Sequence, residues 1–491
     1  MVDPNAGNTT SGNIQALVSR VDYGISMVRM MDITQGIFNF NFFGSGTMMS
    51  NTIGFEITDS LDAFYKIGKV VLADEDAFNE LMPLTGNEVI AIRYKNMVSS
   101  INSGEKIVYF RIFSVDETDN FMNQNAKPSS KFIVLNLAEF PAFDMLSLSA
   151  VYKSYPDNKN YVSTIAQDML KAIPNIEKYY AIQNVDKTQG TLSFWIPHWT
   201  PMKTLKYLQQ YAMSDDNLPM YVLRIEQSDM KTSSSASQLQ SMSFTSVYSL
   251  LQSASGRVYS TIKAEQRYRD PDVANDPTAI DPSPSADQDK NNTPQDVILA
   301  KRIISADGSM TYAGMNGFTL VSRDAVDGCI TYPSTYRDFM SDYNSLGFYG
   351  VYPTDPNKVW GNQWSKYSPT HLPSKNADII NAYQSNIYAR RTLLGAEKAV
   401  LFCYVNEFRK PGELATLMLP SGNPANMLDF MRSGNYLTWS VTDKVMASGE
   451  GVSEVMVVRD SYHLPDGVSG FLPKLSSSLT NANISSLNPL S

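Results

Sequence analysis

Short runs of apolar residues with a period of two, separated by turn residues, constrain the fold of this 491-residue chain more than any other feature. Phenylalanines alternate with asparagines in residues 37–43, and apolar and polar residues alternate in residues 54–59. Runs rich in β-branched and aromatic residues follow at 89–94, 106–115 and 132–137. Successive side chains of a strand point to opposite faces, so this pattern predicts an antiparallel sheet or barrel.

The pattern changes after about residue 140. Residues 161–173 carry apolar side chains at helical spacing, which predicts a helix. Thr200 followed by Pro201 has the form of a helix N-cap with proline at the first helical position. Strand-like runs at 191–196 and 220–226 surround this second helix. The sequence therefore predicts a compact unit of mixed helices and strands.

Strand signals return towards the C-terminus. A helix is predicted at 376–394, stopped by Gly395, and it is followed by strands. The expected strands are residues 399–407, 414–419, 436–440 and 454–458. By contrast, residues 270–294 hold six Asp and five Pro and almost nothing apolar, so they cannot bury enough area to offset the entropy of ordering.

These patterns divide the chain into six expected segments. They are a flexible N-terminal arm at 1–25, a β-barrel-like domain at 26–140, an α+β insert at 141–230, a linker at 231–294 with a disordered acidic loop at 270–294, a second sheet-rich domain at 295–470, and a loose C-terminal tail at 471–491.

Composition excludes several classes of function. A net charge of −9 leaves no excess of Lys and Arg to displace counterions, which argues against nucleic-acid binding. Two cysteines, Cys329 and Cys403, build neither a disulfide framework nor a usual cysteine metal site. No secretion signal and no apolar run of about 18 residues is present, so we expect a soluble chain without membrane insertion, kept in a reducing compartment. Only 18% of residues are charged, against about 25% in an average domain, which suggests surfaces covered by other chains.

Sequence motifs of catalysis and cofactor binding are missing. The histidines His198, His371 and His463 lack metal-ligand spacing, and there is no nucleophile elbow, phosphate loop or dinucleotide fingerprint. The glycine cluster at 44–47 is expected to be a turn because no helix pattern follows it. We therefore predict no catalytic, cofactor-binding or metal-binding residues, no cofactor and no enzyme activity.

A few side chains invite a functional interpretation that the pattern does not favour. Asp59 with Asp62, and the acidic residues 74–76, are expected to be solvated loop or helix-start residues. His198 lies between two tryptophans and is expected to be packed and hydrogen-bonded. Trp360 and Trp364, in the aromatic segment 333–373, are expected to belong to a packed loop.

Several short motifs follow one another in a distinctive order. They are residues 54–61, 86–90 (Gly-Asn-Glu-Val-Ile), 106–115, 195–201 with the helix and strand after it, 419–424, and 434–437. In this order they resemble the central baseplate hub (tail-hub) proteins of contractile-tailed, T-even-like bacteriophages, in a superfamily shared with type VI secretion spike-complex proteins. The similarity spans about residues 40–465. Leu437 stands where that family has Val, and residues 270–294 and 333–373 depart from its pattern.

The resemblance implies a fold class and an assembly. The fold class is α+β, mainly β, with two tube-like antiparallel β-barrel domains, 26–140 and 295–470, and the α+β insert between them. Three copies would form a pseudo-six-fold ring that joins the tail tube to the central spike and encloses the genome channel. Implied partners are two further copies in a homotrimer, the tail tube protein, the central spike protein and baseplate wedge proteins, with the tape measure protein as a further candidate.

The same resemblance implies a location in the virion tail baseplate, after assembly in the host cytoplasm. DNA would only pass through the channel, and an acidic wall would not hold it. Two alternatives stay open. One is a glycan-cleaving tail enzyme with carboxylates from residues 333–373, since sugars stack on aromatic rings. The other is a different tail-tip structural protein or adhesin, although no repeat typical of adhesins is present.

Overall fold

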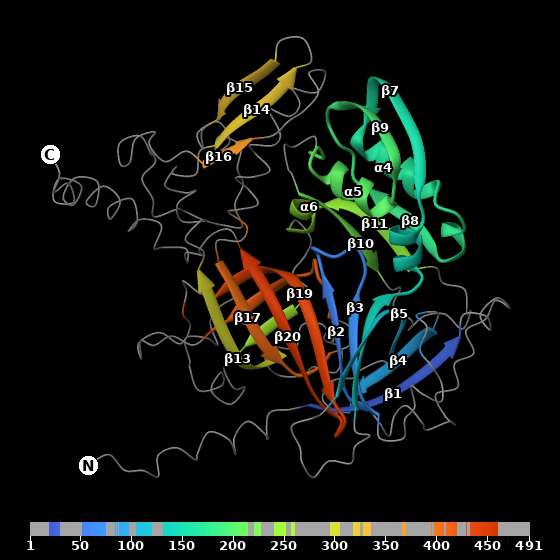
Figure 1. The fold of residues 1–491 in the computed structure, drawn as a ribbon. Coiled ribbons are helices and arrows are strands. Elements are labelled where there is room, and N and C mark those ends of the chain that lie inside the picture. The colour runs from blue at the N-terminus through green and yellow to red at the C-terminus, as the bar shows by residue number, and fades with distance from the viewer. Residues whose placement is uncertain are drawn as a thin grey trace, which may run out of the picture.

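The structure is a computed structural model, and strands dominate the part of the chain that it describes (Figure 1). The described residues are 19–29, 52–74, 84, 86, 88–97, 105–119, 131–214, 220–226, 240–251, 257–260, 295–304, 318–324, 328–334, 366–369, 394, 397–406, 409–419, 429 and 433–459. The prediction of a mainly β chain is confirmed for these residues.

Eight of the described strands pair in a closed circuit, here called the first circuit. Its strands are β1 (Ser19–Arg29), β2 (Thr52–Ser60), β3 (Ile67–Asp74), β4 (Glu88–Asn96), β5 (Lys106–Asp119), β6 (Lys131–Glu139), β19 (Gly434–Met446) and β20 (Glu450–Arg459). They pair in the order β1, β4, β5, β6, β3, β2, β19, β20 and back to β1, and every pairing is antiparallel. In β6, buried Ile133, Leu135 and Leu137 alternate with half-buried residues, so the period of two found in the sequence corresponds to one buried face.

A second circuit is built around the same last two strands. It adds β12 (Arg257–Ser260), β13 (Gln295–Ile304), β17 (Glu397–Cys403) and β18 (Leu414–Met418). The order is β12, β13, β17, β20, β19, β18 and back to β12. Strand β12 runs parallel to both β13 and β18, so the expected antiparallel arrangement of the second domain does not hold at β12, while the other pairings of this circuit are antiparallel.

The β19–β20 hairpin belongs to both circuits. On the outer edge of β19, residues 434–437 pair with β18 and residues 440–446 pair with β2. On the outer edge of β20, residues 453–459 pair with β17 and residues 450–451 pair with β1. The sequence placed these strands in the C-terminal domain alone, because period-two patterns do not reveal which edges a strand will fill.

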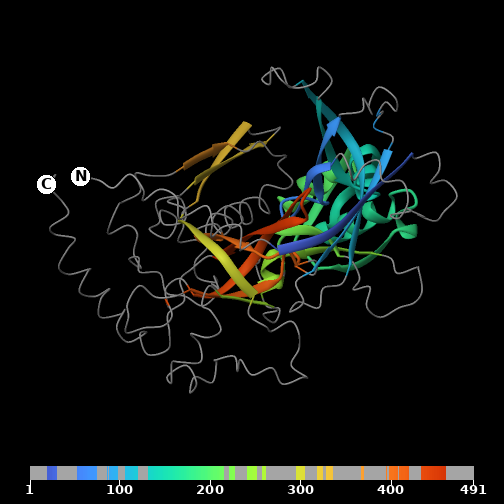
Figure 2. The same cartoon turned by 90° about the horizontal axis from the view of Figure 1, so that it is seen from below.

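A mixed unit, here called the insert, lies beside the end of the first circuit (Figures 1 and 2). Its elements are η3 (Asp144–Leu148), β7 (Val151–Tyr161), α4 (Val162–Lys171), η4 (Ile176–Lys178), β8 (Tyr180–Val185), β9 (Thr191–Trp199), α5 (Pro201–Gln209), β10 (Tyr221–Glu226), β11 (Gln240–Ser246) and α6 (Val247–Leu251). Strands pair as β10-β11-β8 and as β7-β9. The predicted cap is present, since the Thr200 side chain accepts a hydrogen bond from the backbone N–H of Lys203 at 3.3 Å.

The insert extends further along the chain than expected. Strand β11 and helix α6 fall in the segment 231–294 that the sequence assigned to a linker. β11 pairs with β10 and β8, and buried Met242 and Phe244 join the apolar core of the insert. The few apolar residues of this stretch gave too short a pattern to mark a strand.

One apolar cluster joins the three parts of the chain. Leu61 follows β2, Val222 and Val247 belong to the insert, and Leu437 and Val458 come from the shared hairpin. All five are buried in the same cluster. Burying apolar surface contributes about 25 cal/mol of stability per Å². This cluster therefore helps to hold both circuits and the insert together.

Other expectations have mixed outcomes. β1 begins at Ser19, so the assignment of residues 19–25 to a flexible arm is wrong. Strands β14 (Phe318–Asp324), β15 (Gly328–Ser334) and β16 (Lys366–Pro369) form a separate sheet, so part of the segment 333–373 is strand. The expected strand at 37–43, the acidic loop 270–294, the tail 471–491, and the helix 376–394 apart from Leu394 lie outside the described residues. Within the described part of the chain, no helix has the length and apolar character that crossing a bilayer requires.

Candidate interaction site

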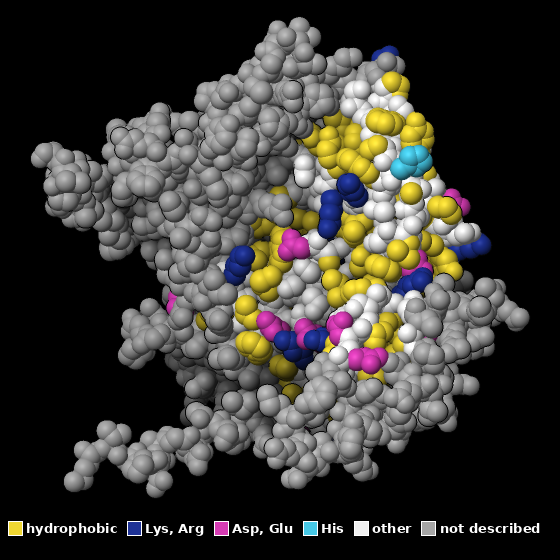
Figure 3. All heavy atoms as spheres, in the orientation of Figure 1, with side chains coloured by type: hydrophobic (Ala, Val, Ile, Leu, Met, Phe, Trp, Pro, Cys, Tyr) yellow, Lys and Arg dark blue, Asp and Glu magenta, His cyan; other side chains and the backbone are white. Residues whose placement is uncertain are grey.

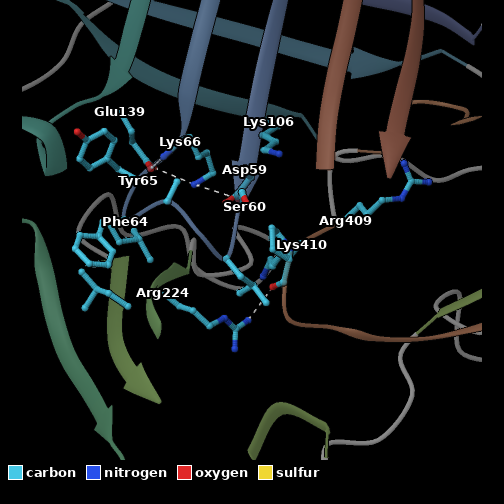
Figure 4. A pocket seen from close by; sticks show the side chains of 15 residues that line it. Asp59, Ser60, Phe64, Tyr65, Lys66, Lys106, Glu139, Arg224, Arg409 and Lys410 are labelled. Atoms are coloured by element: carbon cyan, nitrogen blue, oxygen red, sulfur yellow. Dashed lines mark hydrogen bonds and ion pairs between the residues drawn. The ribbon is translucent and has the colours of Figure 1, made fainter. Parts of the chain in front are cut away.

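A small cavity lies where the first circuit, the insert and the second circuit meet (Figure 4). Its volume is about 40 Å³. The first circuit contributes residues 59–61 and 63–66 with Lys106 and Glu139, the insert contributes residues 223–225, and the chain after β17 contributes residues 409–411. We call this space the junction cavity.

A buried ion pair forms one wall of the junction cavity. The Nζ atom of Lys66 lies 3.0 Å from Oε1 of Glu139, and the backbone N–H of Lys66 donates to Oε2 at 2.9 Å. The two side chains are only 5% and 2% exposed. Asp59 approaches the same Nζ at 3.8 Å. Burial alone would lower the pKa of Lys66, but the two carboxylates outweigh it and the pKa lies above its usual value.

Four more basic side chains line the cavity or its edge. Arg224 donates through Nη2 to the carbonyl oxygen of Pro411 at 3.3 Å, which ties the insert to the loop after β17. Lys106 lies with Nζ 5.5 Å from the ring centre of Tyr94. Arg409 is buried and Lys410 follows it. In Figure 4, Arg224 extends towards the loop that carries Lys410, whereas the head of Arg409 points away.

The buried Arg409 belongs to the core of the second circuit. Its Nη1 donates to the carbonyl of Tyr404 at 3.2 Å, and its guanidinium lies 5.5 Å from the ring centre of Tyr259 on β12. Cys403 is buried nearby, and burial raises the pKa of its thiol to about 11 although Arg409 opposes the shift. The thiol is therefore protonated and unreactive at neutral pH.

A polar network closes the first circuit onto the shared hairpin. The hydroxyl of Tyr94 on β4 donates to Oδ2 of Asp443 at 2.8 Å, and the hydroxyl of Ser453 donates to Oδ1. Asn96 donates to the carbonyl of Val405 at 2.6 Å. All of these side chains are buried, so the network crosses the interior at the place where β1 and β20 share only two paired positions.

The acidic residues considered in the sequence hold the fold together. Asp62 accepts a hydrogen bond from Nε1 of Trp439 at 2.7 Å, and Asp59 faces Lys66. Asp62 is exposed in the turn after β2, as expected, whereas Asp59 lies within β2 and is half-buried, so the expectation of a solvated loop residue is wrong for Asp59. Of residues 74–76, only Asp74 is described, at the end of β3.

The expectation that His198 is packed is wrong. His198 is exposed, with a positive φ of 50°, and its ring stacks on Tyr152 at 5.0 Å between centroids. Tyr152 and Trp195 are 59% and 57% exposed, and together with His198 they form an aromatic surface on β7 and β9. Figure 3 shows apolar side chains gathered over the insert, above a face where acidic and basic groups mix.

Several candidate positions are not described. These are the glycine cluster 44–47, Glu75, Asp76, His371, His463, Trp360 and Trp364. Within the described ranges, no group of three or more His, Cys, Asp or Glu could hold a metal ion. The residues of the junction cavity were missed because Lys66, Glu139, Arg224 and Lys410 lie far apart in the sequence and belong to no motif.

Comparison with solved structures finds similarity to phage tail proteins and to components of type VI secretion. A tail protein from Neisseria meningitidis MC58 is 11% identical, with 89% of this chain and 97% of that chain covered and a TM-score of 0.46. The 43 kDa tail protein of prophage MuSo2 from Shewanella oneidensis is 12% identical, with 89% and 97% covered and a TM-score of 0.44. The E. coli c3393 protein, a component of the type VI secretion system, is 8% identical, with 84% and 76% covered and a TM-score of 0.40. No protein-family model matches the chain, and no curated protein sequence matches it.

Proposed function

We propose that this chain is a structural protein of a contractile tail, the central baseplate hub, and that it is not an enzyme. The observation that carries the proposal is the β19–β20 hairpin, whose two outer edges are each divided between the first and the second circuit. A chain that links two closed strand circuits through one rigid hairpin presents two tube-like units at a fixed relation to each other.

A pair of tube-like units in one chain suits a protein that connects a six-fold assembly to a three-fold one. Three copies of a chain with two tube-like units place six units around one axis, while the assembly as a whole keeps three-fold symmetry. The proposed homotrimer therefore matches a six-fold tail tube on one side and a three-fold central spike on the other. The domains proposed are the first unit at about 19–140, the insert at 141–251, and the second unit around the four strands that the second circuit adds.

The proposed partners follow from this position in the tail. They are two further copies of the chain, the tail tube protein, the central spike protein, the baseplate wedge proteins and, as a further candidate, the tape measure protein. DNA passes through the enclosed channel without sequence-specific contact. The proposed location is the tail baseplate of a virion assembled in the host cytoplasm.

The described carboxylates support a structural role. Glu139 binds Lys66, and Asp443 accepts hydrogen bonds from Tyr94 and Ser453. Glu88 accepts a hydrogen bond from the backbone N–H of Gly86 at 2.8 Å. Each of these buried carboxylates has a partner that the fold itself provides, whereas glycan cleavage needs a pair of carboxylates facing an open cleft.

Mass photometry of the purified chain over a concentration series, with negative-stain images, tests the proposal. We expect a species of three times 54.6 kDa, about 164 kDa, that forms rings with a central hole. A chain that stays monomeric at all concentrations, also when mixed with a spike protein, would contradict the hub. Turnover of a glycan that one carboxylate substitution abolishes would favour the enzyme instead.

A further inference from the structure

A β-bulge between β7 and β9 creates the aromatic surface of Tyr152, Trp195 and His198. The register of the two strands shifts where Tyr152 faces both Pro197 and His198, so β9 has one extra residue there. Trp195 and His198 are three positions apart, and in a regular strand their side chains would point to opposite faces. The bulge turns both to one face, where their ring centroids lie 6.3 and 5.0 Å from that of Tyr152.

These three rings are not part of the apolar core of the insert. Tyr152, Trp195 and His198 are exposed. The neighbouring rings of Phe194 and Trp199 point to the other side and pack in the core. In Figure 1, β7 and β9 lie at the end of the insert that is remote from both circuits. The exposed rings therefore remain available to a ligand.

The backbone at His198 is strained. Its φ of 50° lies in the left-handed region, which residues other than glycine adopt at an energetic cost. Burial does not offset this cost, since the imidazole is exposed and stacked on Tyr152. Strained residues of this kind cluster at ligand-binding sites, where the strain keeps a side chain in place before the ligand arrives.

The aromatic surface has polar groups at its edge but no carboxylate, ammonium or guanidinium among its residues. Ser154 pairs with Trp195 across the two strands and is exposed, so the two side chains lie next to each other. The indole N–H and the imidazole nitrogens are further hydrogen-bonding groups. Lys153 points to the opposite face, where its Nζ lies 3.3 Å from Oδ2 of Asp168. A neutral ligand with hydroxyl groups matches this composition better than an ionic one.

The exposed area indicates a small ligand. Tyr152 and Trp195 are 59% and 57% exposed. Side chains of this kind have about 150–250 Å² of surface each, so the two together offer about 200–300 Å². A stable protein interface covers about 800 Å² on each partner. The aromatic surface alone is thus too small for a protein partner, and it is wide enough for one or two six-membered rings.

Sugars combine the two properties that this surface selects. One face of a pyranose ring carries C–H groups, whose weakly positive hydrogens are attracted to the negative face of an aromatic ring. The edge of the same ring carries hydroxyls, which donate and accept hydrogen bonds. In β-linked chains of glucose or N-acetylglucosamine the substituents are equatorial, so these C–H faces stay open along the chain.

We propose that the aromatic surface binds a neutral β-linked glycan. One sugar ring stacks on the exposed indole of Trp195, the next contacts Tyr152, and the hydroxyl of Ser154 bonds to a sugar hydroxyl. His198 holds the ring of Tyr152 in position through the stacked contact. Glycan binding is a second function beside the proposed structural role, and it involves no cleavage.

Saturation-transfer NMR of the full chain with chitotriose and, separately, with cellotriose tests this inference. Both are neutral β-linked trisaccharides, one with and one without N-acetyl groups. We expect transfer of magnetisation from the protein to the ring C–H protons of both sugars, and a signal that saturates at millimolar sugar. Absence of transfer to both sugars would overturn the proposal.

Two variants and a control locate the site. Trp195→Ala removes a stacking ring and should weaken binding about tenfold. His198→Gly removes the imidazole but keeps the bulge, since glycine adopts a positive φ freely. It should weaken binding about threefold without loss of thermal stability. The matched control is Tyr161→Ala, which removes an exposed tyrosine at the other end of β7 and should leave affinity unchanged. Equal affinity in all folded variants would show that sugars bind elsewhere.

Mass photometry of Trp195→Ala separates a sugar site from an interface between copies. We expect the same distribution of oligomers as for the unchanged chain. Loss of oligomers without any change in sugar binding would show that a second copy covers the surface, and the proposal would be wrong. The sugar titration does not depend on trimer formation, so it can fail while the proposed structural role holds.

Discussion

The first and second circuits close onto the shared hairpin in different ways. The second circuit meets β20 along seven paired positions between β17 and residues 453–459. The first circuit meets β20 at only two positions, Ser19 with Gly451 and Arg20 with Glu450. Buried side-chain bonds reinforce this narrow contact, as Tyr94 and Ser453 donate to Asp443 and Asn96 donates to Val405.

The two circuits thus close in different ways, one through a broad backbone ladder and the other through a narrow contact. A broad backbone ladder tolerates most side chains, since its hydrogen bonds come from the main chain. A narrow contact depends on particular side chains and on close packing. At Gly451, an added Cβ would lie 2.7 Å from Cγ2 of Val21 and 2.9 Å from Cγ2 of Val405, so only glycine fits there. The first circuit should therefore be more sensitive to side-chain substitution than the second.

The largest effect is expected at the ion pair beside the junction cavity. Glu139→Gln leaves the buried ammonium of Lys66 with only the more distant carboxylate of Asp59, at 3.8 Å, which should cost up to about 3–5 kcal/mol of unfolding free energy. Urea denaturation measures the loss. The double variant Lys66→Met with Glu139→Leu removes both charges and should recover most of the stability. A double variant as unstable as the single one would show that lost packing, and not the unpaired charge, causes the loss of stability.

At the narrow contact, Asp443→Ala should cost about 3 kcal/mol. The substitution leaves two buried hydroxyls, of Tyr94 and Ser453, without their acceptor, and each such group costs about 1–3 kcal/mol. Asp443→Asn keeps an acceptor and should cost less. Thermal unfolding measures both variants. Equal stability of Asp443→Ala and the unchanged chain would show that the network does not hold the first circuit closed.

The second circuit can be followed through the thiol of Cys403. Its pKa is raised from 9.0 to about 11, so between these pH values the unfolded chain loses the proton and the folded chain keeps it. Stability is therefore complete below pH 9 and falls as pH rises to 11, by up to about 3 kcal/mol. Denaturation at several pH values should show a smaller fall for Cys403→Ala. An identical fall in both proteins would mean that the thiol is not buried.

The smallest effect is expected in the insert. Thr200→Ala removes the N-cap of α5 and should cost about 1 kcal/mol, whereas Thr200→Ser keeps the hydroxyl and should be nearly neutral. Circular dichroism during thermal unfolding measures the change. Met202 and Lys206 of α5 contact Tyr65 and Phe64 between β2 and β3. A loss much larger than about 1 kcal/mol would therefore show that the cap also supports this contact with the first circuit.

The sequence predicted the parts of the fold that local patterns encode. Residues 54–59, 89–94, 106–115 and 132–137 are strands, and the Thr200 cap is present. The double use of β19 and β20 could not be predicted, since a strand's own residues do not state which neighbours fill its edges. The parallel pairing of the four-residue strand β12 could likewise not be predicted, because so short a run shows no clear hydrophobic periodicity.

The junction cavity could not be predicted from the sequence for a related reason. Its charges come from residues between 59 and 411 that no motif connects, and tertiary folding alone brings them together. For His198, by contrast, the sequence led to an expectation that was wrong, because its tryptophan neighbours suggested burial. A positive φ instead places it at the surface against Tyr152.

Residue-resolved amide hydrogen exchange of the β19–β20 hairpin tests the central claim most directly. In an isolated hairpin, alternate amides point outward and exchange within seconds to minutes. If the hairpin closes both circuits, outward amides in residues 440–446 and 453–459 bond to β2 and β17 and should be protected as strongly as the inward ones. Rapid exchange at every second amide along either strand would show a free edge, and the account of two circuits joined by one hairpin would be wrong.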